Sequence, residues 1–128
     1  MSRVRTAAEK DKQRLKRQEQ VRNRPLTPDP EIDPKCILKV SSTTDPNKLA
    51  GAIASEIRVE GIVVIDAIGG GSVNQAIKAI AVARGWLVPS GILLIFYPKL
   101  IDRTLEDEAR EVTVTRLFCQ PREPLTMV

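Results

Sequence analysis

Three consecutive glycines and the polar side chains after them have the clearest chemical potential in this sequence. In "IDAIGGGSVNQAIKAI", Gly69 to Gly71 separate an apolar strand-like run from a helix-like run. Such a turn can hold a phosphate, because open backbone N–H groups and the helix dipole both favour an anion at a helix N-terminus. Asn74 and Gln75 lie four and three residues before Lys78, so one solvent-facing patch would carry all three. Lys78 is suited to a phosphate, and the two amides to sugar or base edges.

The same residues also have a purely structural interpretation. Glycine permits a positive φ and close packing, and the polar side chains would then be an ordinary wet helix face. A dinucleotide-binding loop requires a third glycine where Asn74 stands, and a Walker loop requires a Gly-Lys-Ser/Thr that the sequence lacks. We therefore expect no nucleotide cofactor, and the residues alone favour the structural interpretation.

Composition argues against several kinds of catalysis. The 128 residues include no His and two Cys, Cys36 and Cys119, so the chain lacks the clusters that zinc sites and most pairs of a nucleophile and a base require. We expect a protein that is not an enzyme, with no catalytic residues, no metal and no cofactor. Asp66 is an acid-base candidate because it lies in an apolar run, but a hydrogen-bonded structural role is the stronger expectation. No apolar stretch resembles a secretory signal or a membrane span, so a reducing cytoplasm with free thiols is expected.

The positive charge is concentrated at the N-terminus. Residues 1–24 carry nine Lys and Arg against three acids, a net charge of +6, whereas residues 25–128 carry 11 basic and 13 acidic side chains, a net charge of −2. Residues 1–24 are expected to be a disordered or marginally helical tail, and the proline-rich residues 25–34 a linker. The tail would either attract RNA, DNA or an acidic protein, or serve as a solubilising arm.

Downstream of the linker, the apolar pattern predicts four strands. Apolar runs mark strands at 36–40 and 62–68, and the second is so continuously apolar that we expect it in the centre of the sheet. Two later runs predict strands at 92–98 and 111–120. The charged stretch 99–111 between them is expected to be an exposed hairpin loop.

The first helix is expected to begin with Asp45 as its N-cap and Pro46 at its first position, and to end at Gly61. The spacing of its apolar residues predicts one buried stripe. That stripe consists of Leu49, Ala50, Ile53, Ala54 and Ile57.

The second helix is expected to begin at Ser72, with Gln75 completing a capping box, and to end at Gly85. Its predicted inward face consists of Val73, Ala76, Ile77, Ile80 and Ala83.

This β-α-β-α-β-β order predicts an α/β chain of the two-layer α+β sandwich type. Two helices would cover one face of a four-stranded mixed sheet, with parallel pairing through the crossovers and an antiparallel closing hairpin. The domain is expected to span residues 35–123, followed by a short C-terminal tail at 124–128.

The stretches "ILKVSSTTDPNKLAGAIASEIRVEG" and "IDAIGGGSVNQAIKAIAVARGWLVPSGILLI", with the closing strand through "QPRE", closely resemble the bacterial stage V sporulation protein S family. The resemblance covers about Cys36 to Glu123, and "AIGGGSVNQAIKAIAVARG" is its most specific part. Members of that family look like Alba proteins. The resemblance implies an Alba-like fold, dimers or higher oligomers, and a role in binding nucleic acid.

Alba-type binding uses the loop after the first strand and the loop into the second helix. The nucleic-acid-binding residues that the resemblance and the patch together indicate are Ser41, Ser42, Thr43, Thr44, Lys48, Gly69, Gly70, Gly71, Ser72, Asn74, Gln75 and Lys78. The first loop carries one lysine rather than the adjacent lysines of the best-known Alba proteins. The main hypothesis is a regulatory protein of the sporulation type that binds RNA or DNA as a homodimer or tetramer. The alternative is a protein-interaction or assembly module in developmental regulation.

Overall fold

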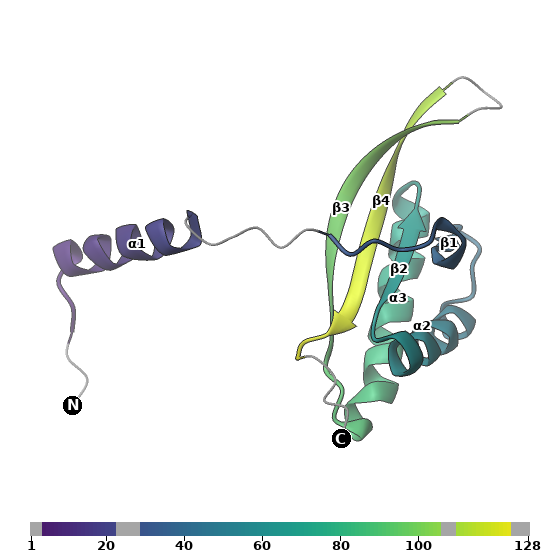
Figure 1. Cartoon of the computed structure of the whole chain (residues 1–128), viewed down its shortest axis with the longest axis horizontal. Coiled ribbons are helices and arrows are strands. Elements are labelled where there is room, and N and C mark those ends of the chain that lie inside the picture. The colour runs from purple at the N-terminus through teal and green to yellow at the C-terminus, as the bar shows by residue number, and fades with distance from the viewer. Residues whose placement is uncertain (1–3, 23–28, 106–109, 124–128) are drawn as a thin grey trace. The chain divides into compact units, whose positions relative to one another are not determined.

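A computed structural model describes residues 4–22, 29–105 and 110–123 of the chain. These residues fall into two compact units, Met1–Glu31 and Ile32–Val128. The second unit contains the sheet and its two covering helices (Figure 1).

The N-terminal unit contains one helix, α1 (Ala7–Arg22), where the sequence favoured disorder. Its described side chains are exposed except Glu9, which is half-buried. Ala, Lys, Arg, Gln and Glu all have high helix propensity, so local preference rather than burial explains this helix. Of the expected linker, residues 25–28 lie outside the described residues, 29–33 are irregular, and Pro34 begins a short 3₁₀ turn that ends at Cys36.

The Ile32–Val128 unit confirms the predicted β-α-β-α-β-β order and the four-stranded mixed sheet. Its strand order is β1-β2-β4-β3, with β1 parallel to β2 and the other pairs antiparallel. The elements are β1 (Leu38–Val40), α2 (Pro46–Glu60), β2 (Val63–Ala67), α3 (Gly70–Leu87), β3 (Leu94–Leu105) and β4 (Arg110–Pro121). The first strand is shorter than expected, because Cys36 belongs to the preceding turn.

Helix α2 has the predicted ends and the predicted buried stripe. The Asp45 side chain accepts a hydrogen bond of 2.9 Å from the Asn47 N–H, and Pro46 occupies the first turn. Gly61 ends the helix with φ 76°, a left-handed conformation that glycine adopts without steric cost. All five apolar positions of the predicted stripe are buried.

Helix α3 begins and ends outside the predicted bounds. Its N-cap is Gly69, and no side chain caps it, so the predicted capping box at Ser72 is wrong. Gly85 lies inside the helix, which continues to Leu87. The buried positions shift accordingly. The inward face gains Ala79 and Leu87, while Val73 is half-buried and Ile77 is exposed.

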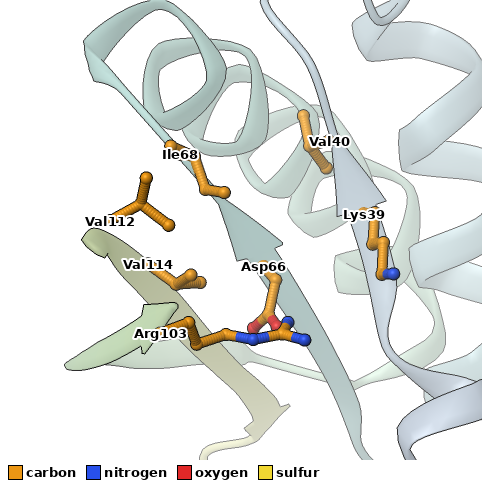
Figure 2. Close-up of a pocket in the computed structure, with 7 residues that line it drawn as sticks. All are labelled: Lys39, Val40, Asp66, Ile68, Arg103, Val112 and Val114. Carbon is orange, nitrogen blue, oxygen red and sulfur yellow. The ribbon is translucent and has the colours of Figure 1, made fainter. Parts of the chain in front are cut away.

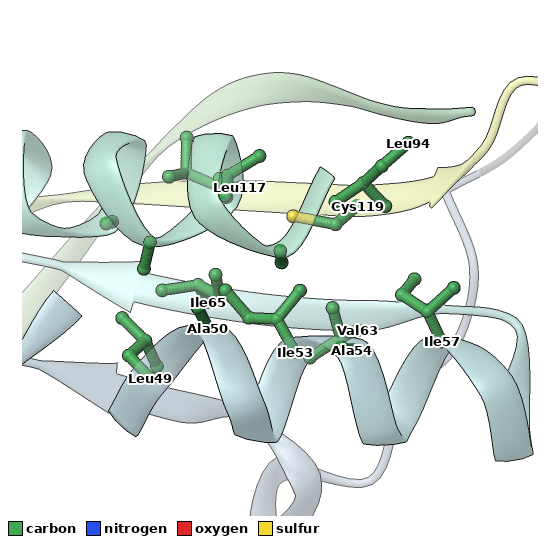
Figure 3. Close-up of a cluster of buried hydrophobic side chains, with 14 of the residues drawn as sticks. Leu49, Ala50, Ile53, Ala54, Ile57, Val63, Ile65, Leu94, Leu117 and Cys119 are labelled. Atoms are coloured by element: carbon green, nitrogen blue, oxygen red, sulfur yellow. The ribbon is translucent and has the colours of Figure 1, made fainter. Parts of the chain in front are cut away.

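Both helices pack on one face of the sheet. On β2, Val63 and Ile65 join the same buried cluster as Leu117 and Cys119 of β4, which lie opposite them in the register. Figure 3 shows these side chains meeting those of α2, including Ile53. Strand β2 lies between β1 and β4, and all five of its residues are buried, as its continuous apolar run predicted.

Cys119 is part of this core and is chemically protected by it. Burial raises the pKa of its thiol from 9.0 to about 12, because the apolar surroundings disfavour the thiolate. The nucleophilic form is therefore suppressed at neutral pH. Cys36 is free as well, but it is exposed.

The hairpin β3–β4 is much longer than predicted. Residues 99–105, expected to form an exposed loop, continue β3, whereas residues 106–109 lie outside the described residues. The pairing of β3 with β4 runs from Leu94 to Leu105, but β2 pairs with β4 only over Thr115–Cys119. The hairpin therefore extends beyond the four-stranded part of the sheet, and Figure 1 shows it as a curved ribbon. Its second strand has a run of β-branched residues from Val112 to Thr115, which favours an extended conformation.

Candidate nucleic-acid interface

The loop after β1 and the turn into α3 meet at one edge of the sheet. Because β1 and β2 are parallel, their carboxyl ends point the same way and their outgoing loops become neighbours. The Gln75 side-chain amide donates a 2.9 Å hydrogen bond to the Thr44 carbonyl oxygen, across 31 positions of sequence. We call residues 41–45 together with 69–78 the strand-end corner. It brings together both loops that the sequence analysis singled out.

Each glycine of the triplet has a different role in this corner. Gly69 has φ 87° and ψ 157°, a backbone conformation essentially restricted to glycine. A Cβ added to Gly71 would lie 3.0 Å from the Ser42 Cβ, so the bare backbone lets the two loops approach. Gly70 has neither constraint, since a Cβ there would meet nothing within 4 Å. The structural interpretation therefore accounts for two of the three glycines.

The loop after β1 is held by its own hydroxyl groups. The Ser41 N–H donates to the Thr44 Oγ1 at 2.9 Å, and the Ser41 hydroxyl lies 3.1 Å from that of Thr43. The Thr44 N–H in turn donates to the Ser41 carbonyl at 3.2 Å. These bonds fix the loop before any ligand arrives. The Ser41 hydroxyl has no further capacity, because it also contacts the Thr44 hydroxyl and accepts from the Thr43 N–H.

The polar side chains of α3 do not all face solvent as predicted. Asn74 and Lys78 are exposed, one turn apart. Gln75 is half-buried and committed to the Thr44 carbonyl, so it joins the two loops rather than presenting its amide to solvent. Ser72 is 6% exposed and faces the core, so it is a poor ligand-binding residue. Lys48 is exposed near the start of α2.

The electrostatics of the corner favour an anion. The first N–H groups of an α-helix have no acceptor within the helix, and no side chain caps those of α3. The helix dipole adds partial positive charge at the same point, and Lys78 adds a full charge two turns further along. The carboxylate of Asp45 is engaged in capping α2.

Asp66 has the structural role that the sequence favoured. Its two carboxylate oxygens accept hydrogen bonds of 2.7 and 2.9 Å from the Arg116 guanidinium on the neighbouring strand β4. The two residues are register partners in the sheet. Sequence reasoning missed Arg116, because pairing β2 with β4 across 50 residues leaves no local signal.

The described residues were found to contain neither a metal-binding cluster nor a membrane-spanning helix. Among residues 4–22, 29–105 and 110–123, no cluster of His, Cys, Asp and Glu could hold a metal ion. Within the same ranges, no helix is long and apolar enough to span a membrane.

The contact between Gly71 and Ser42 can be tested with a matched pair of substitutions. Gly71→Ala is expected to force the two loops apart, whereas Gly70→Ala adds the same methyl group in open space. Both positions lie in the first turn of α3, so the two variants share any gain in helix propensity. Thermal unfolding should show that the free energy of unfolding of Gly71→Ala is about 1–3 kcal/mol lower than that of Gly70→Ala, which is the usual cost of overpacking. Equal stabilities would show that the close approach is not a constraint.

The sequence and the fold of this chain are similar to those of known proteins. Residues 36–120 match the family model of stage V sporulation protein S. A solved structure of Alba from Thermoplasma volcanium is similar over 66% of this chain and 98% of that chain, at 12% identity and a TM-score of 0.47. The family match includes both loops of the strand-end corner and all four strands except the last residue of β4. This chain therefore belongs to the stage V sporulation protein S family.

Proposed function

We propose that this protein is a non-enzymatic regulatory protein that binds RNA or DNA in the cytoplasm and contacts phosphate through the strand-end corner. The observation that carries the proposal is the joining of the two loops by Gln75 and Gly71 beside an uncapped helix N-terminus. Backbone N–H groups at such a terminus suit a phosphate oxygen. The exposed Lys48, Asn74 and Lys78 supply further contacts.

The corner alone offers few cations, so the proposal includes the N-terminal helix. The basic side chains of helix α1 between Lys10 and Arg17 are exposed. Sequence-independent affinity for nucleic acid comes mainly from neutralised phosphates, and residues 25–128 have a net charge of −2. We assign the larger part of the electrostatic attraction to α1. The strand-end corner would position the bound nucleic acid.

We also propose that the protein acts as a homodimer. Large apolar side chains remain exposed at the end of α3, on the turn that follows it, and on β3, and exposure of such side chains to solvent is unfavourable. They include Trp86, Val88 and Ile95. A second copy of the chain is the partner that would cover such side chains in a homodimer.

Reversing the charge of Lys78 tests the corner. Lys78→Glu should weaken binding to a labelled RNA or DNA oligonucleotide about tenfold, because it removes one phosphate contact and adds repulsion. The thermal midpoint should change little, because exposed helix positions rarely alter stability by more than about 0.5 kcal/mol. Affinity is measured by fluorescence anisotropy over a range of salt concentrations.

The matched control is Arg58→Glu. It makes the same change in net charge at the last turn of α2, away from the helix N-termini at the corner. Weakening by both variants to the same extent would indicate a general charge effect and would contradict a site at Lys78. Unaltered affinity in Lys78→Glu would remove Lys78 from the site. The absence of salt-dependent binding by the wild-type protein would instead favour an assembly module.

A further inference from the structure

A pocket lies on the face of the sheet opposite the helices, where β1 and β2 end and the long hairpin begins. It has a volume of about 210 Å³. Its apolar lining comes from Val40, Ile68, Val112 and Val114, and its charged lining from Lys39, Asp66 and Arg103. These residues belong to all four strands or, for Ile68, directly follow one. The unusual length of the hairpin creates the pocket, because Val112 and Arg103 are register partners in the part beyond the four-stranded sheet.

The charges around the pocket do not balance. Asp66 is already neutralised, since Arg116 binds both of its carboxylate oxygens. Lys39 and Arg103 are exposed, and neither forms an ion pair with any of the residues that the structure describes. In Figure 2 the Arg103 side chain extends to Asp66, where the two side-chain ends overlap in the view, and Lys39 lies beyond them on β1. Among the described residues that line the pocket, Lys39 and Arg103 are cations, and the one acid, Asp66, is already bound by Arg116.

We propose that this pocket binds a small organic anion, a carboxylate or phosphate carried on a compact apolar body. The anionic group would lie between the Lys39 ammonium and the Arg103 guanidinium, which matches carboxylate and phosphate oxygens in pairs. The apolar body would pack on Ile68, Val112 and Val114, whereas Val40 belongs to the core under the helices and only borders the pocket at the end of β1. Drug-sized sites measure roughly 300–1,000 Å³, so this smaller pocket fits a single ring or a short branched chain.

This site is separate from the strand-end corner, although the two are neighbours in sequence. Val40 and Ile68 line the pocket, and Ser41 and Gly69, the next residues, begin the two loops of the corner. The two sites lie at the same edge of the sheet. The pocket inference does not depend on nucleic-acid binding.

Titration of the full chain with three probes tests the inference. Benzoate combines a charge with an apolar ring, inorganic phosphate has the charge alone, and benzyl alcohol has the ring alone. Chemical shifts of the Val112 and Val114 methyl groups report occupancy. We expect saturable shifts with benzoate at a Kd on the order of millimolar, and no saturation with the other two probes.

Variants that remove one charge then distinguish specific benzoate binding in the pocket from non-specific electrostatic attraction to the protein. Lys39→Gln and Arg103→Gln should each weaken benzoate binding about tenfold, the worth of one charged hydrogen bond. Arg58→Gln, with the same loss of charge on α2, should leave it unchanged. Val112→Trp should abolish binding by filling the pocket.

Three results would overturn the inference. They are equal shifts from benzyl alcohol, competition by phosphate as effective as that of benzoate, and the absence of saturable benzoate binding in the wild-type protein. Should Val112→Trp fail to fold, the two glutamine variants still decide the question.

Discussion

Asp66→Val is expected to destabilise the fold by about 2–4 kcal/mol. The substitution leaves the Arg116 guanidinium without its partner on a sheet where its side chain is only 23% exposed. Removing one member of a fully buried ion pair costs roughly 3–5 kcal/mol, and the partial exposure of Arg116 reduces that figure. Valine favours strands, so the loss cannot be attributed to strand propensity. Urea unfolding at neutral pH measures the change in the free energy of unfolding.

A double-mutant cycle separates the ion pair from the side chains themselves. Arg116→Leu should also be destabilising, because it leaves the Asp66 carboxylate, which is 7% exposed, without its partner. Asp66→Val combined with Arg116→Leu should cost less than either single change, since apolar replacement of a buried pair is often nearly neutral. Additive losses would contradict a direct coupling between the two side chains.

Neutralising helix α1 should have the largest effect on affinity for nucleic acid. The variant replaces five basic residues by Gln: Lys10, Lys12, Arg14, Lys16 and Arg17. Each lost phosphate contact lowers the slope of log affinity against log salt by about 0.7–0.9, so the binding at low salt should fall on the order of a hundredfold. Fluorescence anisotropy with the full chain, at several salt concentrations, gives both quantities.

The control exchanges Lys and Arg at the same five positions and thereby keeps the charge. That variant should bind with the original slope, because counterion release depends on charge rather than on side-chain type. If the glutamine variant retained both slope and affinity, α1 would be a solubilising arm and the core would have to supply the binding.

Much of the fold could be predicted because its signals are local. The Asp45 cap, Pro46 and Gly61 mark both ends of α2, and the continuous apolar run of β2 implied burial on both faces. The start of α3 was misjudged, because Ser72 and Gln75 have the spacing of a capping box but are used for packing and for the contact with Thr44. A tertiary contact outweighed a local preference there.

The site was less predictable than the fold. The resemblance to Alba proteins singled out both loops, but the sequence could not show that Gln75 joins them or that Ser72 is buried. Those facts depend on the rotation of α3 about its axis, which is fixed by the packing of Ala79 and Leu87. Arg116 and the pocket beside Asp66 depend on the pairing of distant strands, so no short sequence pattern indicates either.

Strand β3 lies at the outer edge of the sheet over twelve residues, with Pro98 near its middle. An open edge of that length is a template onto which a foreign strand could add, and continued addition leads to fibrils. Proline has no N–H to offer an incoming strand, so Pro98 interrupts the template. Pro98 therefore opposes the growth of an unlimited sheet from this edge.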